Sequence, residues 1–138
     1  DRKGKAASML MVGSLIMIAC HLSFAFLLPM FPSKVFAVAI IAILGVSFSL
    51  VPAALWPSVP KIIDERILGS AYCVIFWIQN WGLLLVPVII GKVLDVTGGY
   101  TMPMVIFSSF GVVALFMGML LKVEDKKKGY GLEEPNIK

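Results

Sequence analysis

The residues of this chain best suited to chemistry are polar side chains set within apolar sequence. In residues 68–82, Tyr72, Gln79 and Asn80 stand among apolar neighbours. Tyr72 and Gln79 are seven positions apart and share one face of a helix, whereas Asn80 lies about 100° further round. Each amide has donors and an acceptor to satisfy. Such groups either bond neighbouring helices together or line a path for a polar solute.

Two further residues have alternative roles of the same kind. Trp56, followed by Pro57, is either an anchor at the surface of a membrane or the wall of a cavity. His21 could relay protons, but it has no acidic residue within its own apolar run. We therefore expect His21 to pack or to make an interhelical hydrogen bond.

Pro87, Gly91 and Asp95 recur at intervals of four residues and so line one helical face. A structural role in outer-end helix packing is favoured over ion binding. We expect Asp95 to cap the next helix or to accept from Lys92.

Several function classes are excluded by what the chain lacks. It contains no nucleophile elbow, no glycine-rich phosphate loop and no cluster with the spacing of metal ligands. We therefore predict no enzyme activity, no catalytic residues, no cofactor and no metal. Its basic residues are not interleaved with aromatic ones, so nucleic acid is not an expected partner.

The elements that position these residues are four runs without a charged side chain. They cover residues 6–33, 35–60, 67–91 and 96–121. Each is longer than the roughly 20 apolar residues that span a bilayer core, and the mean hydropathy is +0.96. Because backbone groups in lipid must bond internally, we predict an all-α, polytopic membrane bundle of four transmembrane helices.

Prolines and glycines between the runs set the expected boundaries. The predicted spans are about 6–28, 35–59, 68–93 and 101–121, which form one transmembrane segment over residues 1–121. Residues 122–138 are predicted to be a basic, disordered cytoplasmic tail. The short connections predict that consecutive helices are antiparallel and pack as neighbours.

The distribution of positive charge predicts the orientation. Of the 12 lysines and arginines, all but Lys34 and Lys92 lie before the first run, between the second and third, or after the fourth. With four crossings these segments share one face, and positive charge marks the cytoplasmic side. Both termini are therefore expected in the cytoplasm. The short loops favour a bacterial cell (inner) membrane, with the lysosomal membrane as the alternative.

A family resemblance is carried by short motifs. Asp1-Arg2-Lys3-Gly4-Lys5 resembles the second half of a cytoplasmic loop motif of the major facilitator superfamily, although Ala6 replaces its last basic residue. The branch that includes the lysosomal dipeptide transporter is also similar to this chain at His21 and at four short stretches. These stretches are Ala54-Leu55-Trp56-Pro57, Leu68-Gly69-Ser70-Ala71-Tyr72, Ile78-Gln79-Asn80-Trp81-Gly82 and Gly91-Lys92-Val93-Leu94-Asp95.

The resemblance implies the last third of a twelve-helix transporter, helices nine to twelve, which alternates access by rocking its two halves. It implies that helices ten and eleven border the cavity while nine and twelve support them. The implied pathway candidates are Trp56, Tyr72, Gln79 and Asn80. The implied cytoplasmic gate comprises Asp1, Arg2, Gly4 and Lys5.

The sequence thus predicts the C-terminal portion of a secondary transporter for a small polar solute, with short peptides as one option. Its expected partners are the lipid bilayer, the remaining helices of the full-length transporter and the solute. The alternative is a stand-alone four-helix membrane scaffold without transport activity.

Overall fold

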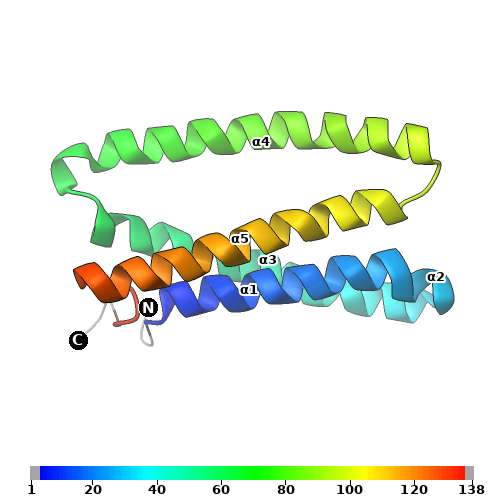
Figure 1. The fold of residues 1–138 in the computed structure, drawn as a ribbon, viewed down its shortest axis with the longest axis horizontal. Helices are drawn as coiled ribbons and strands as arrows, with labels where there is room; N and C mark the ends of the chain where they lie inside the picture. Colours follow the sequence, from blue (N-terminus) through cyan, green and yellow to red (C-terminus); the bar gives the residue numbers. More distant parts are fainter. Residues whose placement is uncertain (1–3, 136–138) are drawn as a thin grey trace.

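Four long helices run back and forth in the computed structural model, which describes residues 4–135 (Figure 1). Helix α1 (Ala6–Leu22) continues through a π-helical turn η1 (Ser23–Leu27) into the short α2 (Leu28–Met30). Then follow α3 (Lys34–Ile62), a 3-10 turn η2 (Glu65–Ile67), α4 (Leu68–Thr97) and α5 (Thr101–Lys128). Each of the four stretches is long and apolar enough to cross a membrane, which confirms the predicted all-α membrane bundle.

Local sequence signals explain the start of α3 and the end of α4. Ser33 precedes α3, and its hydroxyl accepts from the Phe36 N–H at 3.5 Å, as an N-cap does. Gly98 ends α4 with a left-handed backbone at φ 63°, a conformation that glycine adopts at little cost. The connection between the third and fourth spans therefore lies at the glycine pair, between Thr97 and Thr101.

The region after residue 121 differs from the predicted disorder. Helix α5 continues to Lys128 because lysine and glutamate favour helices and lysines suit a helix C-terminus; it ends at left-handed Gly129. Beyond it, Leu132 is fully buried. Residues 136–138 lie outside the described part of the chain.

Helix α1 is the centre of the bundle, because α3 and α5 both pack on it. Towards α5, a Cβ on Gly111 would lie 2.7 Å from Ile18 Cγ1, and one on Gly118 would lie 3.2 Å from Met11 Cγ. Towards α3, the buried Ser47 hydroxyl donates to the Gly13 carbonyl at 2.6 Å. Small residues and a buried hydroxyl thus bring these three backbones together, as in membrane bundles generally.

Helix α4 lies apart from this three-helix core (Figure 1) and has no buried residue. α4 makes close backbone contacts with α5, although α5 packs mainly on α1. The prediction that consecutive helices pack as neighbours is wrong for α3 and α4, whose backbones make few close contacts. The glycines explain the difference. A Cβ on Gly69, Gly82 or Gly91 of α4 would meet nothing within 4 Å, so these positions bring no other helix close.

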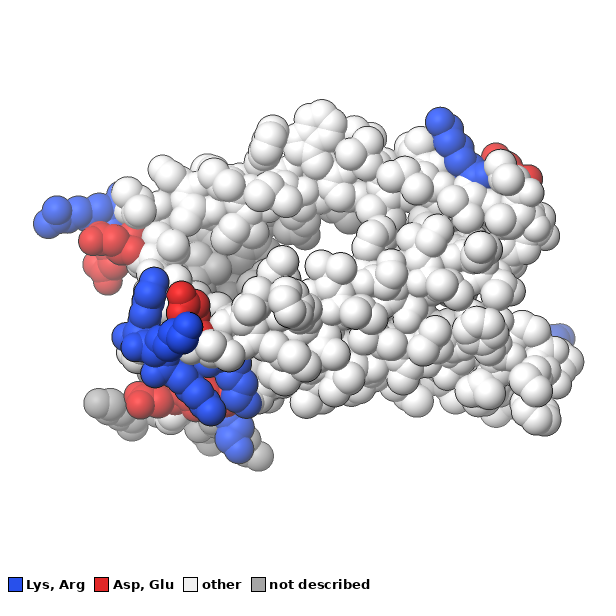
Figure 2. All heavy atoms as spheres, viewed as in Figure 1, with Lys and Arg blue, Asp and Glu red and all other residues white. Residues whose placement is uncertain are grey.

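Charged side chains gather at the two ends of the bundle and leave an uncharged band between them (Figure 2). Both ends of the chain lie at the same end of the bundle (Figure 1). We call this the terminal end; it contains Lys5, Lys61 and the lysines at 126–128. An uncharged band with charged rims is the surface expected of a protein that spans lipid.

The Gly111 contact predicts a stability difference between two glycines. Gly111→Ala should lower the free energy of unfolding in detergent micelles by about 1–3 kcal/mol, because the new methyl group would overlap Ile18. Gly45→Ala is the matched control, since a Cβ there meets nothing within 4 Å. Equal stability of the two variants in a denaturant titration would contradict the close α1–α5 contact.

Candidate functional site

The contact between α3 and α4 is built on a backbone carbonyl that proline leaves without its helical partner. In an α-helix the Trp56 carbonyl would accept from the N–H of residue 60, but residue 60 is proline and has no N–H. The Tyr72 hydroxyl of α4 donates to this carbonyl at 3.2 Å. Pro60 and Tyr72 are thereby linked in one arrangement, because the first creates the acceptor that the second satisfies.

Aromatic rings extend the same contact. The Trp56 ring stacks on Phe76 at a centroid distance of 4.9 Å and contacts Tyr72 at 5.8 Å. Phe76 was not among the residues predicted from the sequence. Its signal was available, since Phe76 follows Tyr72 by one helical turn and so lies on the same face.

Beside this cluster, a cavity of about 310 Å³ lies between α1, α3 and α4. It is lined by Met17, Phe48, Val51, Pro52, Leu55, Trp56, Ile75 and Gln79. Trp56 is therefore part of a cavity wall, which was one of its two predicted roles. The structure brings three of the four predicted pathway residues together: Trp56, Tyr72 and Gln79.

Gln79 is the amide side chain in that lining. Within residues 4–135 its side chain has no hydrogen-bonding partner from another residue. An amide at membrane depth needs a partner, so Gln79 can receive one from a molecule in the cavity or from protein outside this chain.

Asn80 is placed differently from its neighbour. Its Nδ2 donates to the Phe76 carbonyl one turn earlier in α4, at 2.7 Å. The amide is thus bonded within its own helix rather than to another helix, and the cavity lining does not include it.

His21 takes the packing role predicted for it. Its Nδ1–H donates to the Met17 carbonyl at 2.8 Å, and its ring stacks on Phe107 of α5 at 5.4 Å. The ring thereby joins α1 to α5.

Pro87, Gly91 and Asp95, the residues predicted for outer-end helix packing, do not act as one group. Pro87 and Gly91 line a second cavity, of about 520 Å³, together with Phe107. Asp95 does not cap α5: the N-cap there is Tyr100, which makes no side-chain capping bond. That expectation was wrong because α4 continues to Thr97, so Asp95 remains inside α4. Among the described residues, the one ion pair joins Lys128 to Glu124.

The predicted gate motif is described in part. Asp1 and Arg2 lie outside the described residues, while Gly4 is buried and Lys5 is exposed. Both described residues have left-handed backbones, with φ 63° and 64°. They form the turn that leads into α1.

Comparison with known proteins shows similarity to lysosomal dipeptide transporters. The chain is 34% identical over 132 residues to the lysosomal dipeptide transporter MFSD1 of Danio rerio, covering 96% of this chain and 27% of the relative. It is 32% identical to the protein of that name from Bos taurus, with the same two shares, and 37% identical over 65% of this chain and 19% of the relative to that of Homo sapiens.

The chain thus spans about a quarter of the length of the first two relatives. No family model matches the chain. No solved structure matches it either.

The link between Pro60 and Tyr72 predicts a dependence between two substitutions. Tyr72→Phe alone should destabilise the protein in micelles by about 1 kcal/mol, because the Trp56 carbonyl loses its partner. In a Pro60→Ala background the new N–H can bond that carbonyl, so Tyr72→Phe should cost little there. Tyr100→Phe, on an exposed ring, is the control, and an equal cost in both backgrounds would refute the link.

Proposed function

The chain belongs to the major facilitator superfamily, and from this premise we propose that the protein containing it moves a small polar solute, a short peptide, across a membrane. Dipeptide transport is what the relatives' names say of them. For this chain the proposal is supported by the cavity between α1, α3 and α4.

The observation that carries the proposal is the Gln79 amide. It lines an otherwise apolar cavity and has no partner within residues 4–135. Small-molecule sites have this character, with an apolar lining and a few polar groups that fix orientation. A peptide offers the amide side chain both an N–H donor and a carbonyl acceptor.

A second polar group supports a peptide as the solute. Pro52 lacks an N–H, so the Phe48 carbonyl is without its usual helical donor, and both residues line the cavity. We infer that this carbonyl accepts from the ammonium or amide N–H of the solute. Trp56 would then form an apolar wall beside it.

The remainder of the pathway is proposed to come from the rest of a longer protein. We infer that this chain corresponds to helices nine to twelve of twelve, and that α4, which has no buried residue, packs on the other helices. In this arrangement α3 and α4 border the solute pathway while α1 and α5 support them. Alternating access would proceed by rocking of two halves about the pathway.

We also propose that the terminal end faces the cytoplasm, because most of the positive charge lies there. The relatives and the four spans support a multi-pass membrane protein. The bacterial cell membrane stays a prediction from the short loops.

The transport proposal predicts opposite outcomes for two neighbouring amides. In the full-length protein reconstituted in liposomes, Gln79→Ala should lower dipeptide uptake about tenfold, the effect of one solute hydrogen bond of about 1.4 kcal/mol. Asn80→Ala is the matched control, since that amide bonds its own helix, and its uptake should stay close to wild type.

Two outcomes would contradict the proposal. Equal uptake by Gln79→Ala and wild type would remove Gln79 from the pathway. Absence of dipeptide uptake by the wild-type protein would instead favour a membrane scaffold. Size-exclusion chromatography of both variants shows whether each still folds.

The orientation predicts one-sided labelling of single cysteines. In vesicles of native orientation, with Cys20 and Cys73 replaced by alanine, a membrane-impermeant maleimide should label Lys34→Cys from outside and Lys127→Cys only after lysis. Both lysines are exposed and lie at opposite ends of the bundle. The reverse pattern would place the terminal end outside the cytoplasm.

A further inference from the structure

The segment after α5, residues 129–135, folds back onto the start of α1 (Figure 1). Left-handed glycines at 129 and 131, with φ 67° and 72°, turn the backbone. Leu132 is fully buried, and its N–H donates to the Asp125 carboxylate of α5 at 3.0 Å. The segment is therefore docked through both a side chain and its backbone.

Helix α1 receives from this segment the cap that its own sequence does not provide. Lys5, at its N-cap position, makes no side-chain capping bond. Instead the Ala6 N–H donates to the Leu132 carbonyl at 3.0 Å. The N–H and the hydroxyl of Ser8 each donate to the Glu133 carboxylate at 2.9 Å.

These contacts satisfy donors that every helix leaves unpaired in its first turn. A carboxylate is also favoured at a helix N-terminus by the helix dipole. Glu133 thus stands where a capping side chain would stand, although it comes from the other end of the sequence. Lys122 of α5 adds to the cluster by donating to the Ser8 hydroxyl at 2.7 Å.

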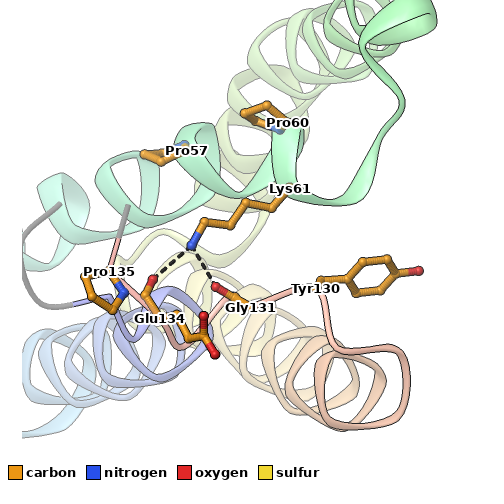
Figure 3. Close-up of a pocket in the computed structure, with 7 residues that line it drawn as sticks. All are labelled: Pro57, Pro60, Lys61, Tyr130, Gly131, Glu134 and Pro135. Carbon is orange, nitrogen blue, oxygen red and sulfur yellow. Dashed lines mark hydrogen bonds between the residues drawn. The ribbon is translucent and has the colours of Figure 1, made fainter. Parts of the chain in front are cut away.

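Helix α3 is joined to the same segment through its last turn. The Lys61 ammonium donates to the Gly131 carbonyl at 2.7 Å and to the Glu134 carbonyl at 2.9 Å (Figure 3). A cleft of about 380 Å³ otherwise separates the end of α3 from the C-terminal segment. It is lined by Pro57, Pro60, Lys61, Tyr130, Gly131, Glu134 and Pro135. The hydrogen bonds of one lysine side chain therefore bridge the cleft.

Gly4 shows how closely the segment fits. A Cβ on Gly4 would lie 2.5 Å from the carbonyl carbon of Glu134, and its φ is +63°. Only glycine permits this backbone approach without displacement. The motif that resembled a gate thus contacts the C-terminal segment directly.

We propose that the ends of α1, α3 and α5 form a docking surface for the chain's own C-terminal segment, residues 130–135, which clasps these three helices together. Glu133 and Leu132 hold it to α1 and α5, and Lys61 holds α3 to it. Lys61 is five positions after Trp56, so the clasp fixes the end of the helix that forms the cavity wall. Only this last consequence rests on the proposed function; the docking does not.

The docking is tested by hydrogen–deuterium exchange of the full-length protein in membranes, without solute. Glu133→Ala should raise exchange of the Ser8 amide about tenfold, because its bond to the carboxylate is lost. Exchange of the Ala6 amide should rise as well, because the segment that carries its acceptor, the Leu132 carbonyl, is then held less firmly. Glu124→Ala is the matched control, since its carboxylate pairs only at the surface with Lys128 at 3.9 Å. Its exchange at Ala6 and Ser8 should equal wild type.

A second variant tests the bridge to α3. Lys61→Met keeps the length of the side chain and removes its donors, so the Leu132 and Glu134 amides should exchange faster than in wild type. If Glu133→Ala and Lys61→Met both exchange like Glu124→Ala, the clasp does not exist. Because exchange needs no transport, this outcome is independent of whether the protein carries a peptide.

Discussion

The hydrogen bond from Tyr72 to the Trp56 carbonyl is the interaction on which the candidate site depends. In lipid a backbone carbonyl finds no water, so a carbonyl freed by proline must be satisfied by protein or solute. Among the residues 4–135, the bond from the Tyr72 hydroxyl is the one side-chain hydrogen bond between α4 and another long helix. Together with the rings of Tyr72 and Phe76 against Trp56, it sets the position of Gln79 on α4 relative to Trp56 on α3, since α4 buries no residue of its own.

The three remaining helices are held by another means. Small residues at Gly13, Gly111 and Gly118 let α1 approach both partners, and close backbones gain van der Waals contact that lipid cannot replace. The bundle therefore combines a tight, glycine-spaced core with one helix attached by aromatic rings and a single hydroxyl. A helix attached in this way is suited to packing against further helices of a longer protein.

Much of the architecture could be predicted from sequence because it depends on local signals. Uncharged run length determined the number of helices, the glycine pair at Gly98 marked a boundary, and the seven-residue spacing placed Tyr72 and Gln79 on one face. Two differences are local: Asp95 stays inside α4, which continues to Thr97, and Asn80 donates within its own helix. Order after residue 128 could not be predicted because it depends on Leu132 and Glu133 meeting the first turn of α1.

By itself the sequence determined that four helices cross lipid. Charged side chains are costly in hydrocarbon, and the chain has four runs without charge that are each long enough to span it. It also determined which carbonyls lack a helical donor, since each follows from the position of a proline. Only the tertiary structure decided which hydroxyl reaches the Trp56 carbonyl, which amide stays unpaired beside the cavity, and which carboxylate caps α1. Those choices depend on how three-dimensional packing brings together residues far apart in the chain, and no local pattern encodes them.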